Sequence, residues 1–319
     1  MTIKRPTLDR AAELRTEVGV VDRFREDATT RVVVVRNGRV RVDLAAVPDE
    51  PRAPVGERDE THRTGAETPA IALVMVAPTE VGDATWALLG RDAAGAAILL
   101  AAVADAAEAI DAAPEETWLG LRDVGARLGA LDAELLVEAI ALAGWLRDAP
   151  FCAVCGGGTE VRQAGWSRRC LSCGREHFPR TDPAVIVAVE SVDGQRLLLG
   201  ANANWGGRMY SCFAGFAEAG ESLEQVVHRE IEEEAGVRLT AIRYISSQPW
   251  PYPRSLMIGF RAVVEDESAA RADGEEIIDV RWFTRAEIGT ALDGEGPVGL
   301  PGSASIARAL IRDWYEDRA

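Results

Sequence analysis

One helical segment near the middle of the chain carries acidic side chains where a helix normally buries aliphatic ones. Residues 215–237 read GFAEAGESLEQVVHREIEEEAGV. At 3.6 residues per turn, Leu223, Val226 and Val227 mark an apolar stripe. Three glutamates fall along the continuation of this stripe, namely Glu230, Glu233 and Glu234. Because like charges repel one another strongly when they are partly desolvated, the pattern predicts a bound divalent cation.

Local signals mark both ends of this predicted helix. Ser222 and Gln225 form a capping box, and Gly236 is suited to end the helix. Glu232 is expected on the opposite face. A run of acids is usually a solvated helix face, but placement on the apolar stripe favours a metal-binding role.

The defined positions of this segment match the Nudix box. They are Gly215, Glu221, Arg229, Glu230, Glu233, Glu234 and Gly236. The segment therefore resembles the Nudix hydrolases, whose motif forms a loop, helix and loop that binds divalent metal and cleaves a diphosphate linked to another group. The match covers 23 residues, so it indicates the chemistry and not the substrate.

Four of the five cysteines have the spacing of a zinc ribbon. They form two CxxC pairs separated by fourteen residues: Cys152, Cys155, Cys170 and Cys173. Gly156 and Gly174 follow the two pairs and allow the tight turn of a metal knuckle. Four thiolates leave no open coordination position, so we expect a structural zinc ion. The remaining Cys212 is expected to be a buried, unreactive thiol.

The charge balance limits the partners of this protein. The 319 residues carry a net charge of −16, which disfavours a protein that coats nucleic acid non-specifically. A basic cluster near the second CxxC pair is a local exception, with four arginines at positions 168, 169, 175 and 180. These arginines either offset thiolate charge or bind phosphate, and the sequence leaves both interpretations open.

The first nineteen residues lack the apolar core of a signal peptide, and the most apolar stretch, 93–104, is too short to span a bilayer. We therefore expect a cytoplasmic protein with no membrane partner.

Hydrophobic periodicity predicts an α+β protein. In its first part we expect a hairpin of strands 30–35 and 39–44 around Asn37-Gly38, an exposed loop over 47–68, further strands at 71–77, 86–89 and 97–100, and a helix over 132–146. In its second part we expect strands at 184–192, 195–200, 241–247, 255–265 and 279–283, and a closing helix at 303–315. The predicted domains are an N-terminal α+β domain (1–148), the zinc ribbon (149–180) and a Nudix domain (181–319), with a mixed sheet flanked by helices.

The segment 247–255, SQPWPYPRS, is the second most specific part of the chain. Three prolines in five residues stiffen a predicted loop that carries Trp250 and Tyr252. Such a loop suits a flat ring, although inward-packing aromatics in a proline-rich turn are equally compatible with the composition.

The motif SQPWP, followed by an aromatic residue and proline, resembles the NADH pyrophosphatase branch of the Nudix family, which also removes NAD caps from RNA and carries a zinc ribbon at this position. The resemblance extends from the ribbon to the C-terminus and includes FPR at 178–180, AGF at 214–216 and IARAL at 306–310.

Carried over residue by residue, the resemblance implies a complete site. The catalytic residues would be Glu230, Glu233 and Glu234, and the ligands of Mg²⁺ or Mn²⁺ would be Glu230, Glu234, Glu276 and the carbonyl of Ala214. The substrate contacts would be Phe178, Phe216, Gln248, Pro249, Trp250, Pro251, Tyr252, Pro253, Arg254, Ser255, Ala307 and Arg122. Phe178 replaces a tyrosine of some members, and Tyr252 replaces the more usual phenylalanine. Arg229 is expected to orient Glu233 through an ion pair four residues away.

The expected reaction is metal-dependent hydrolysis of NADH or NAD to a nicotinamide mononucleotide and AMP, with removal of NAD caps from RNA as a further reaction. The resemblance also implies a homodimer. Two alternatives stay open: hydrolysis of another nucleoside diphosphate derivative such as ADP-ribose, and a non-catalytic nucleotide sensor. The sensor predicts a damaged box, whereas each acidic position is intact here.

Overall fold

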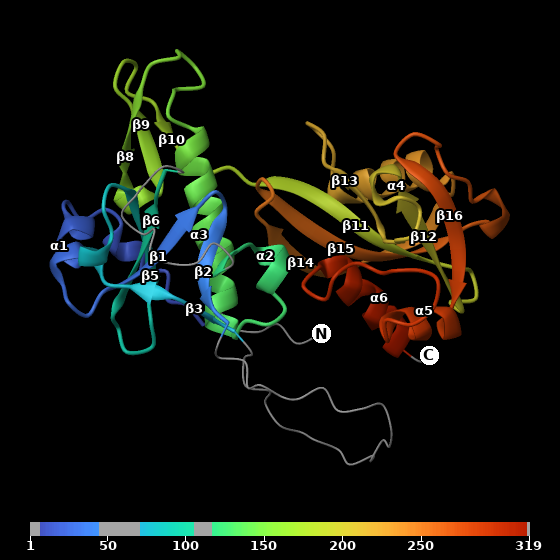
Figure 1. Cartoon of the computed structure of the whole chain (residues 1–319). Helices are drawn as coiled ribbons and strands as arrows, with labels where there is room; N and C mark the ends of the chain where they lie inside the picture. Colours follow the sequence, from blue (N-terminus) through green and yellow to red (C-terminus); the bar gives the residue numbers. More distant parts are fainter. Residues whose placement is uncertain (1–6, 45–70, 105–116, 318–319) are drawn as a thin grey trace, which may run out of the picture. The chain divides into compact units, whose positions relative to one another are not determined.

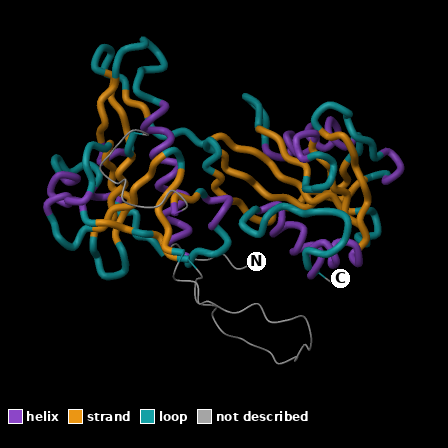
Figure 2. The backbone as a smooth tube through the Cα atoms, viewed as in Figure 1, coloured by secondary structure: helices purple, strands orange, loops and turns teal. Residues whose placement is uncertain are grey.

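The computed structural model describes residues 7–44, 71–104 and 117–317. Contacts within the chain divide it into two compact units, one ending at Arg180 and the other beginning at Thr181. The predicted loop at 47–68 lies outside the described residues. Figure 2 shows strands and helices in both units, so the predicted α+β class is confirmed. In the described ranges, no helix is both long and apolar enough to cross a membrane.

The first unit is built on a seven-stranded sheet, β3-β2-β1-β6-β5, in which β4 also pairs with β1 and β7 with β2. The elements up to the ribbon are η1 (Ala12–Leu14), α1 (Val20–Glu26), β1 (Arg31–Arg36), β2 (Arg39–Asp43), β3 (Ala72–Leu73), β4 (Met75–Val76), η2 (Pro78–Glu80), β5 (Thr85–Arg91), β6 (Ala97–Ala102), β7 (Trp118–Leu119), α2 (Leu121–Val124) and α3 (Ala130–Asp148). The predicted hairpin and helix are confirmed. Asn37 and Gly38 have φ values of 51° and 68°, as a type I′ turn requires.

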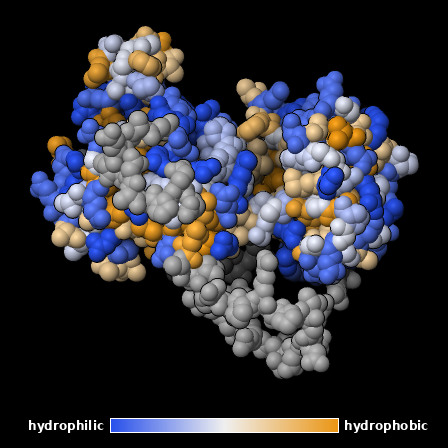
Figure 3. Space-filling view, viewed as in Figure 1, coloured by the Kyte–Doolittle hydropathy of each residue, from blue (hydrophilic) through white to orange (hydrophobic). Residues whose placement is uncertain are grey.

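The ribbon follows α3 as a small sheet in the order β10-β9-β8. Its elements are β8 (Thr159–Arg162), η5 (Gln163–Gly165), β9 (Ser167–Cys170) and β10 (Glu176–His177). The η5 end touches β5 of the larger sheet: a Cβ on Gly165 would lie 2.1 Å from the Cβ of Ala87, and Trp166 donates its indole N–H to the carbonyl of Leu88 at 2.8 Å. The cysteine end is the free end of the ribbon, above the β9 label in Figure 1. Hydrophobic residues appear at this free end in Figure 3, in agreement with the exposure of Val154 and Leu171.

The second unit is a mixed sheet in the order β14-β15-β11-β12-β16, with β13 added beside β11. Its elements are β11 (Asp182–Glu190), β12 (Arg196–Asn202), η6 (Ala203–Trp205), β13 (Phe213–Phe216), α4 (Leu223–Ala235), β14 (Leu239–Trp250), β15 (Ser255–Val264), η7 (Glu267–Ala269), β16 (Ile277–Thr284), α5 (Arg285–Leu292) and α6 (Ile306–Glu316). Strands β11 and β15 are parallel, and β11 and β12 form the predicted hairpin.

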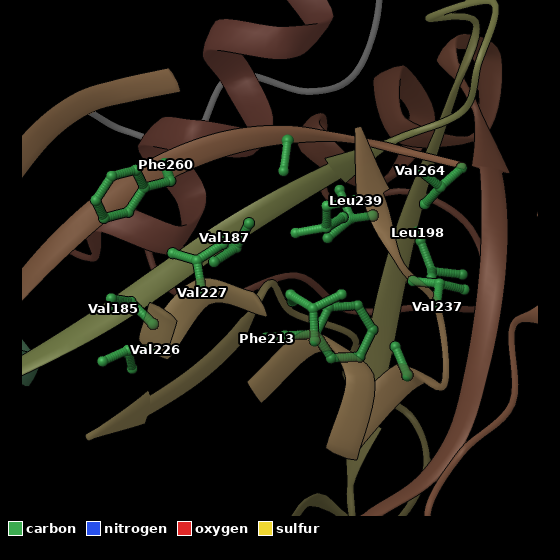
Figure 4. Packing of buried hydrophobic residues seen from close by; sticks show 14 of the residues in the cluster. Val185, Val187, Leu198, Phe213, Val226, Val227, Val237, Leu239, Phe260 and Val264 are labelled. Atoms are coloured by element: carbon green, nitrogen blue, oxygen red, sulfur yellow. The ribbon is translucent and has the colours of Figure 1, made fainter. Parts of the chain in front are cut away.

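The central strand β11 serves two cores because successive side chains point to opposite faces. Val185, Val187 and Val189 pack with α4 in one core, which Figure 4 shows at close range. Ile186 and Ala188 pack with α5 and α6 in the other. The central strand is therefore buried on both faces, with helices packed against each.

The predicted loop at 247–255 is partly wrong. Strand β14 continues through Trp250, which pairs with Ser255, so only residues 251–254 form the turn of a hairpin. The strand tolerates Pro249 because β14 is the edge of the sheet, where a missing N–H removes no bond from a central ladder.

An ion-pair network joins the end of α6 to this sheet. The guanidinium of Arg261, only 6% exposed, donates to both carboxylate oxygens of Glu190 at 2.6 and 2.9 Å and to Asp317 at 2.7 Å. Asp313 lies 3.4 Å away. Removing the guanidinium leaves a carboxylate with little access to water.

We therefore predict that Arg261→Met lowers the free energy of unfolding by about 3 kcal/mol, because a broken buried pair leaves an uncompensated charge. Urea unfolding of the whole chain measures the change. The double variant Arg261→Met/Glu190→Leu should recover much of the loss. Arg312→Ala, which breaks the exposed pair with Glu316, serves as a control and should cost under about 0.5 kcal/mol. Equal effects of the two single variants would contradict the assignment.

Candidate functional site

Helix α4 begins and ends where the sequence predicts. The Ser222 hydroxyl accepts the N–H of Gln225 at 3.3 Å, and the Gln225 side chain accepts the N–H of Ser222 at 2.8 Å. Gly236 ends the helix with a φ of 66°. The buried face carries Val226, Val227, Ile231, Glu234 and Ala235. One carboxylate thus lies among aliphatic side chains.

The three glutamates differ in burial. Glu234 is buried, and the side chains of Glu230 and Glu233 are 13% and 60% exposed. The expectation that Glu233 continues the apolar stripe is therefore wrong. Each residue turns a helix by about 100°, and the buried face is centred on Val227 and Ile231, so Glu233 rotates toward solvent. Glu232 is exposed, as predicted.

Burial, together with the negative charges of Glu276 and Glu230, raises the pKa of Glu234 to about 8, against a backbone hydrogen bond from Ala214. Its Oε2 atom is buried without a hydrogen-bond partner. Burial also raises the pKa of Glu230, whereas the hydrogen bond and the positive charge of Arg229 lower it. An unpartnered buried oxygen among like charges is the condition that a bound cation relieves, so these residues fit a divalent metal.

Arg229 organises the carboxylates around it. Its guanidinium donates to both oxygens of Glu221 at 2.7 and 2.9 Å, to Glu230 at 2.9 Å and to the carbonyl of Phe216 at 3.0 Å. The predicted pair with Glu233 is present at 3.1 Å. The double hydrogen bond lowers the pKa of Glu221 to about 2. Arg229 therefore has its donors committed within the protein, as an orienting residue should.

A glycine gives Glu230 its space. A Cβ at Gly215, on β13, would lie 1.8 Å from the Cδ atom of Glu230 and about as close to both oxygens. No side chain fits there, so the strand and the carboxylate approach each other only because the residue is glycine. Ala214, whose carbonyl is a predicted metal ligand, is the preceding residue on the same strand.

Glu276 precedes β16 and is near enough to Glu230 and Glu234 to raise the pKa of both. The Asn202 amide donates to its carboxylate at 3.4 Å. Asp273, which sequence analysis missed, accepts the N–H groups of residues 275–277 at 2.6, 3.0 and 3.1 Å and so holds this turn. An Asp followed by Gly at a turn was the signal that could have found it.

The four ribbon sulfurs lie within 4.8 Å of one another. In the described part of the chain, they form the one group of three or more potential ligands gathered so closely. Cys212 is buried, as predicted, and burial raises the pKa of its thiol to about 12, which favours the less reactive protonated form. Arg168 is buried and donates to Thr159 and to the carbonyl of Leu146 at 2.7 and 3.1 Å, so this member of the basic cluster is structural.

The predicted substrate residues occupy both units. In the second unit, Trp250 and Tyr252 make an edge-to-face pair with ring centroids 5.6 Å apart. Phe216 is exposed, whereas Ser255 and Ala307 are buried. Among the three prolines, Pro251 is buried, whereas Pro249 and Pro253 are exposed. Arg254 forms an ion pair with Asp182 at 2.9 Å. Phe178, which is exposed, and Arg122, on α2, belong to the first unit.

Gln248 has a contact that sequence analysis did not foresee. Its amide donates to the carbonyl of Ala304 at 2.8 Å and accepts the N–H of Ile306 at 2.7 Å. Both ends of the amide thereby fasten the start of α6, next to Ala307, to strand β14. A predicted substrate contact here has to share the amide with the backbone of α6.

Comparisons with known proteins identify two family domains in this chain. Residues 180–299 match the NUDIX domain, and residues 147–178 match the NADH pyrophosphatase zinc ribbon domain. The chain is 38% identical over 331 residues to the NAD-capped RNA hydrolase NudC of Mycobacterium bovis, a match that covers 98% of this chain and 94% of that protein. It is 37% identical over 193 residues to the human NAD-capped RNA hydrolase NUDT12, covering 57% and 42%. Among solved structures, a Nudix hydrolase from Nitrosomonas europaea aligns with a TM-score of 0.43 and 24% identity, covering 53% of this chain and 91% of that one.

We predict that Gly215→Ala weakens the binding of Mn²⁺ at least tenfold, because the new methyl group displaces the Glu230 carboxylate and a site group moved by about 1 Å loses much of its effect. Electron paramagnetic resonance of free Mn²⁺ measures the affinity. Gly144→Ala, where a Cβ meets no atom within 4 Å, should bind Mn²⁺ as the parent does. Equal affinity of the Gly215 variant and the parent would show that Glu230 does not depend on this approach.

We also predict a pH dependence of stability in Mg²⁺-free buffer. The pKa of Glu234 is about 8 in the folded state and near 4.5 when unfolded, so the folded state binds the extra proton between these values. Its stabilising contribution is complete below pH 4.5 and is lost as the pH rises through 8, with a slope of at most about 1.4 kcal/mol per pH unit. Glu234→Gln should lose less stability than the parent between pH 5 and 8 in urea unfolding. Glu232→Gln, an exposed change on the same helix, should follow the parent curve; if Glu234→Gln follows it too, the carboxyl is not buried as described.

Proposed function

Since this chain belongs to the Nudix hydrolase family, in the branch that carries the NADH pyrophosphatase zinc ribbon, we propose that it hydrolyses the central diphosphate of NADH and NAD and removes NAD caps from RNA. The relative of similar length is named an NAD-capped RNA hydrolase, and the match extends over nearly the whole of both chains. The observation that carries the proposal is the buried, unpartnered oxygen of Glu234 beside Glu230 and Glu276.

The reaction adds water across the P–O–P linkage of the diphosphate: the water oxygen bonds to one phosphorus atom, and the bond from that phosphorus to the bridging oxygen breaks. NADH yields reduced nicotinamide mononucleotide and AMP, and NAD-capped RNA yields nicotinamide mononucleotide and an RNA with a 5′-monophosphate. When bound, Mg²⁺ or Mn²⁺ neutralises the diphosphate charge and acidifies a coordinated water. The carboxylates of Glu230, Glu234 and Glu276 and the carbonyl of Ala214 hold the ions in this proposal.

Two glutamates are candidates for the base that receives the proton of the attacking water. Glu234 is buried beside Glu230 and Glu276, where the ions are held in this proposal. Glu233 is exposed and held by Arg229 at 3.1 Å. Arg229 keeps Glu230 and Glu233 oriented, and its donors face protein oxygens.

The hairpin at 247–255 supports a dinucleotide as substrate. Trp250 and Tyr252 present two aromatic rings at the edge of the sheet, and the prolines around them reduce the entropy lost on binding. A base or a nicotinamide ring can stack against such a surface. Exposed Phe216 lies on β13, the strand that also carries Ala214. The proposal also includes a cytoplasmic location, as the sequence indicates, and a homodimer, as the family resemblance implies. Sedimentation of the purified protein tests the dimer.

We predict that Glu234→Gln lowers kcat with saturating Mg²⁺ by at least about 100-fold, because it removes charge stabilisation that is largest in the transition state. Release of AMP from NADH, measured by chromatography, gives the rate. Glu232→Gln should keep the parent rate. Full turnover by the Glu234 variant would refute the proposed site.

The substrate is tested by comparing kcat/KM for NADH, NAD, ADP-ribose and an NAD-capped oligonucleotide at one salt concentration. The proposal expects NADH, NAD or the capped oligonucleotide to exceed ADP-ribose. Trp250→Ala should raise KM for the preferred dinucleotide by about tenfold, since loss of a stacked ring costs about 1–3 kcal/mol. A clear preference for ADP-ribose would reject the proposed substrate and leave the metal site intact.

A further inference from the structure

The two metal knuckles of the ribbon are near copies of each other. Gly156 and Gly174 both have a φ of 72°, and each donates its N–H to the carbonyl of the first cysteine of its knuckle, at 2.9 and 3.1 Å. In each knuckle the sulfur of the first cysteine also accepts a backbone N–H at 3.4 Å, from Val154 or from Cys173. The backbone thus treats Cys152 and Cys170 alike.

One side chain breaks this equivalence. The Nε2 atom of His177 lies 3.2 Å from the sulfur of Cys152. Within the described ranges, the contacts to the Cys170 sulfur come from the backbone and from a neighbouring cysteine. Cys152 therefore has one donor more than its counterpart, and that donor comes from β10, outside the knuckle.

The chemistry of the contact determines its direction. A zinc-bound cysteine is a thiolate and has no hydrogen to give. The imidazole must then carry its hydrogen on Nε2 and donate it. Four thiolates and one Zn²⁺ carry a net charge of two negative units, and Cys152 is buried, so water cannot spread that charge at this sulfur. The N–H of His177 stabilises the negative charge on this sulfur, as a hydrogen-bonded water would at an exposed sulfur.

The same contact fixes the end of the ribbon. Strand β10 consists of Glu176 and His177 alone. The Glu176 carboxylate accepts hydrogen bonds from Gln163 and Ser167 at 2.9 and 2.5 Å. His177 reaches Cys152 on the first knuckle. Both side chains of the strand are thereby tied back to earlier parts of the ribbon, just before Phe178.

We propose that His177 is an outer-shell member of the zinc site: it donates its Nε2 hydrogen to the Cys152 thiolate, retains the zinc ion and holds the ribbon end that leads into Phe178. This role is independent of the reaction at the Nudix box. Outer-shell donors to metal ligands are worth about 10–100-fold in metal affinity.

The test uses the full chain loaded with zinc and a chromophoric chelator in competition for the metal. His177→Phe keeps a planar ring without a donor and should lower zinc affinity about 10–100-fold. His177→Gln keeps an N–H donor and should retain most of the affinity. Val192→Ala changes an exposed side chain outside the ribbon and should match the parent. Equal affinities of the Phe variant and the parent would overturn the proposal.

A spectroscopic readout separates donation to the thiolate from simple packing. With Co²⁺ in place of zinc, the thiolate-to-metal charge-transfer band should move to lower energy in His177→Phe and stay in place in His177→Gln, because a lost hydrogen bond raises the energy of the sulfur electrons. An unchanged band in the Phe variant contradicts donation. Should that variant fail to fold, the unaltered protein loaded with ¹¹³Cd decides: an imidazole proton with scalar coupling to the metal supports the hydrogen bond, and its absence rejects it.

Discussion

The burial of one carboxylate governs the second unit. Glu234 lies on the apolar face of α4, between aliphatic side chains that pack on β11, and one of its oxygens has no partner. A helix designed only for stability would place a leucine there. The free energy lost by keeping an acid at this point is recovered when a cation binds, so affinity for the metal and strain in the metal-free helix have one origin.

The residues around Glu234 follow from the need to hold several carboxylates close together. Gly215 is glycine because the Glu230 carboxylate occupies the place of a side chain. Arg229 neutralises Glu221, Glu230 and Glu233 from one side and leaves the other side of the cluster negative. Asp273 holds the turn that brings Glu276 near the same point. Each of these residues either positions a carboxylate of the cluster or reduces the repulsion between the carboxylates.

Features encoded by short-range patterns could be predicted from the sequence. The caps of α4, the turn at Asn37-Gly38 and the two cysteine knuckles depend on residues a few positions apart, so their chemistry is visible in a single line of text. Features that depend on long-range packing could not. The exposure of Glu233 follows from which side of α4 meets the sheet, the anchoring of α6 by Gln248 joins residues 56 and 58 positions apart, and the contact of His177 with Cys152 spans 25 positions. The domain boundaries and the assignment of individual substrate contacts stay predictions.

The contact of Gly165 and Trp166 with strand β5 joins the ribbon to the larger sheet and limits how the two can be separated. Gly165 fits against Ala87 only because it lacks a side chain, and the indole of Trp166 is bonded to the backbone of β5. In a ribbon grafted onto another protein, Gly165 and Trp166 would lose their contacts with β5. In a sheet expressed without the ribbon, the part of β5 that contacts these residues would be exposed to solvent. Separating the metal-binding segment from the N-terminal sheet is therefore expected to destabilise both parts.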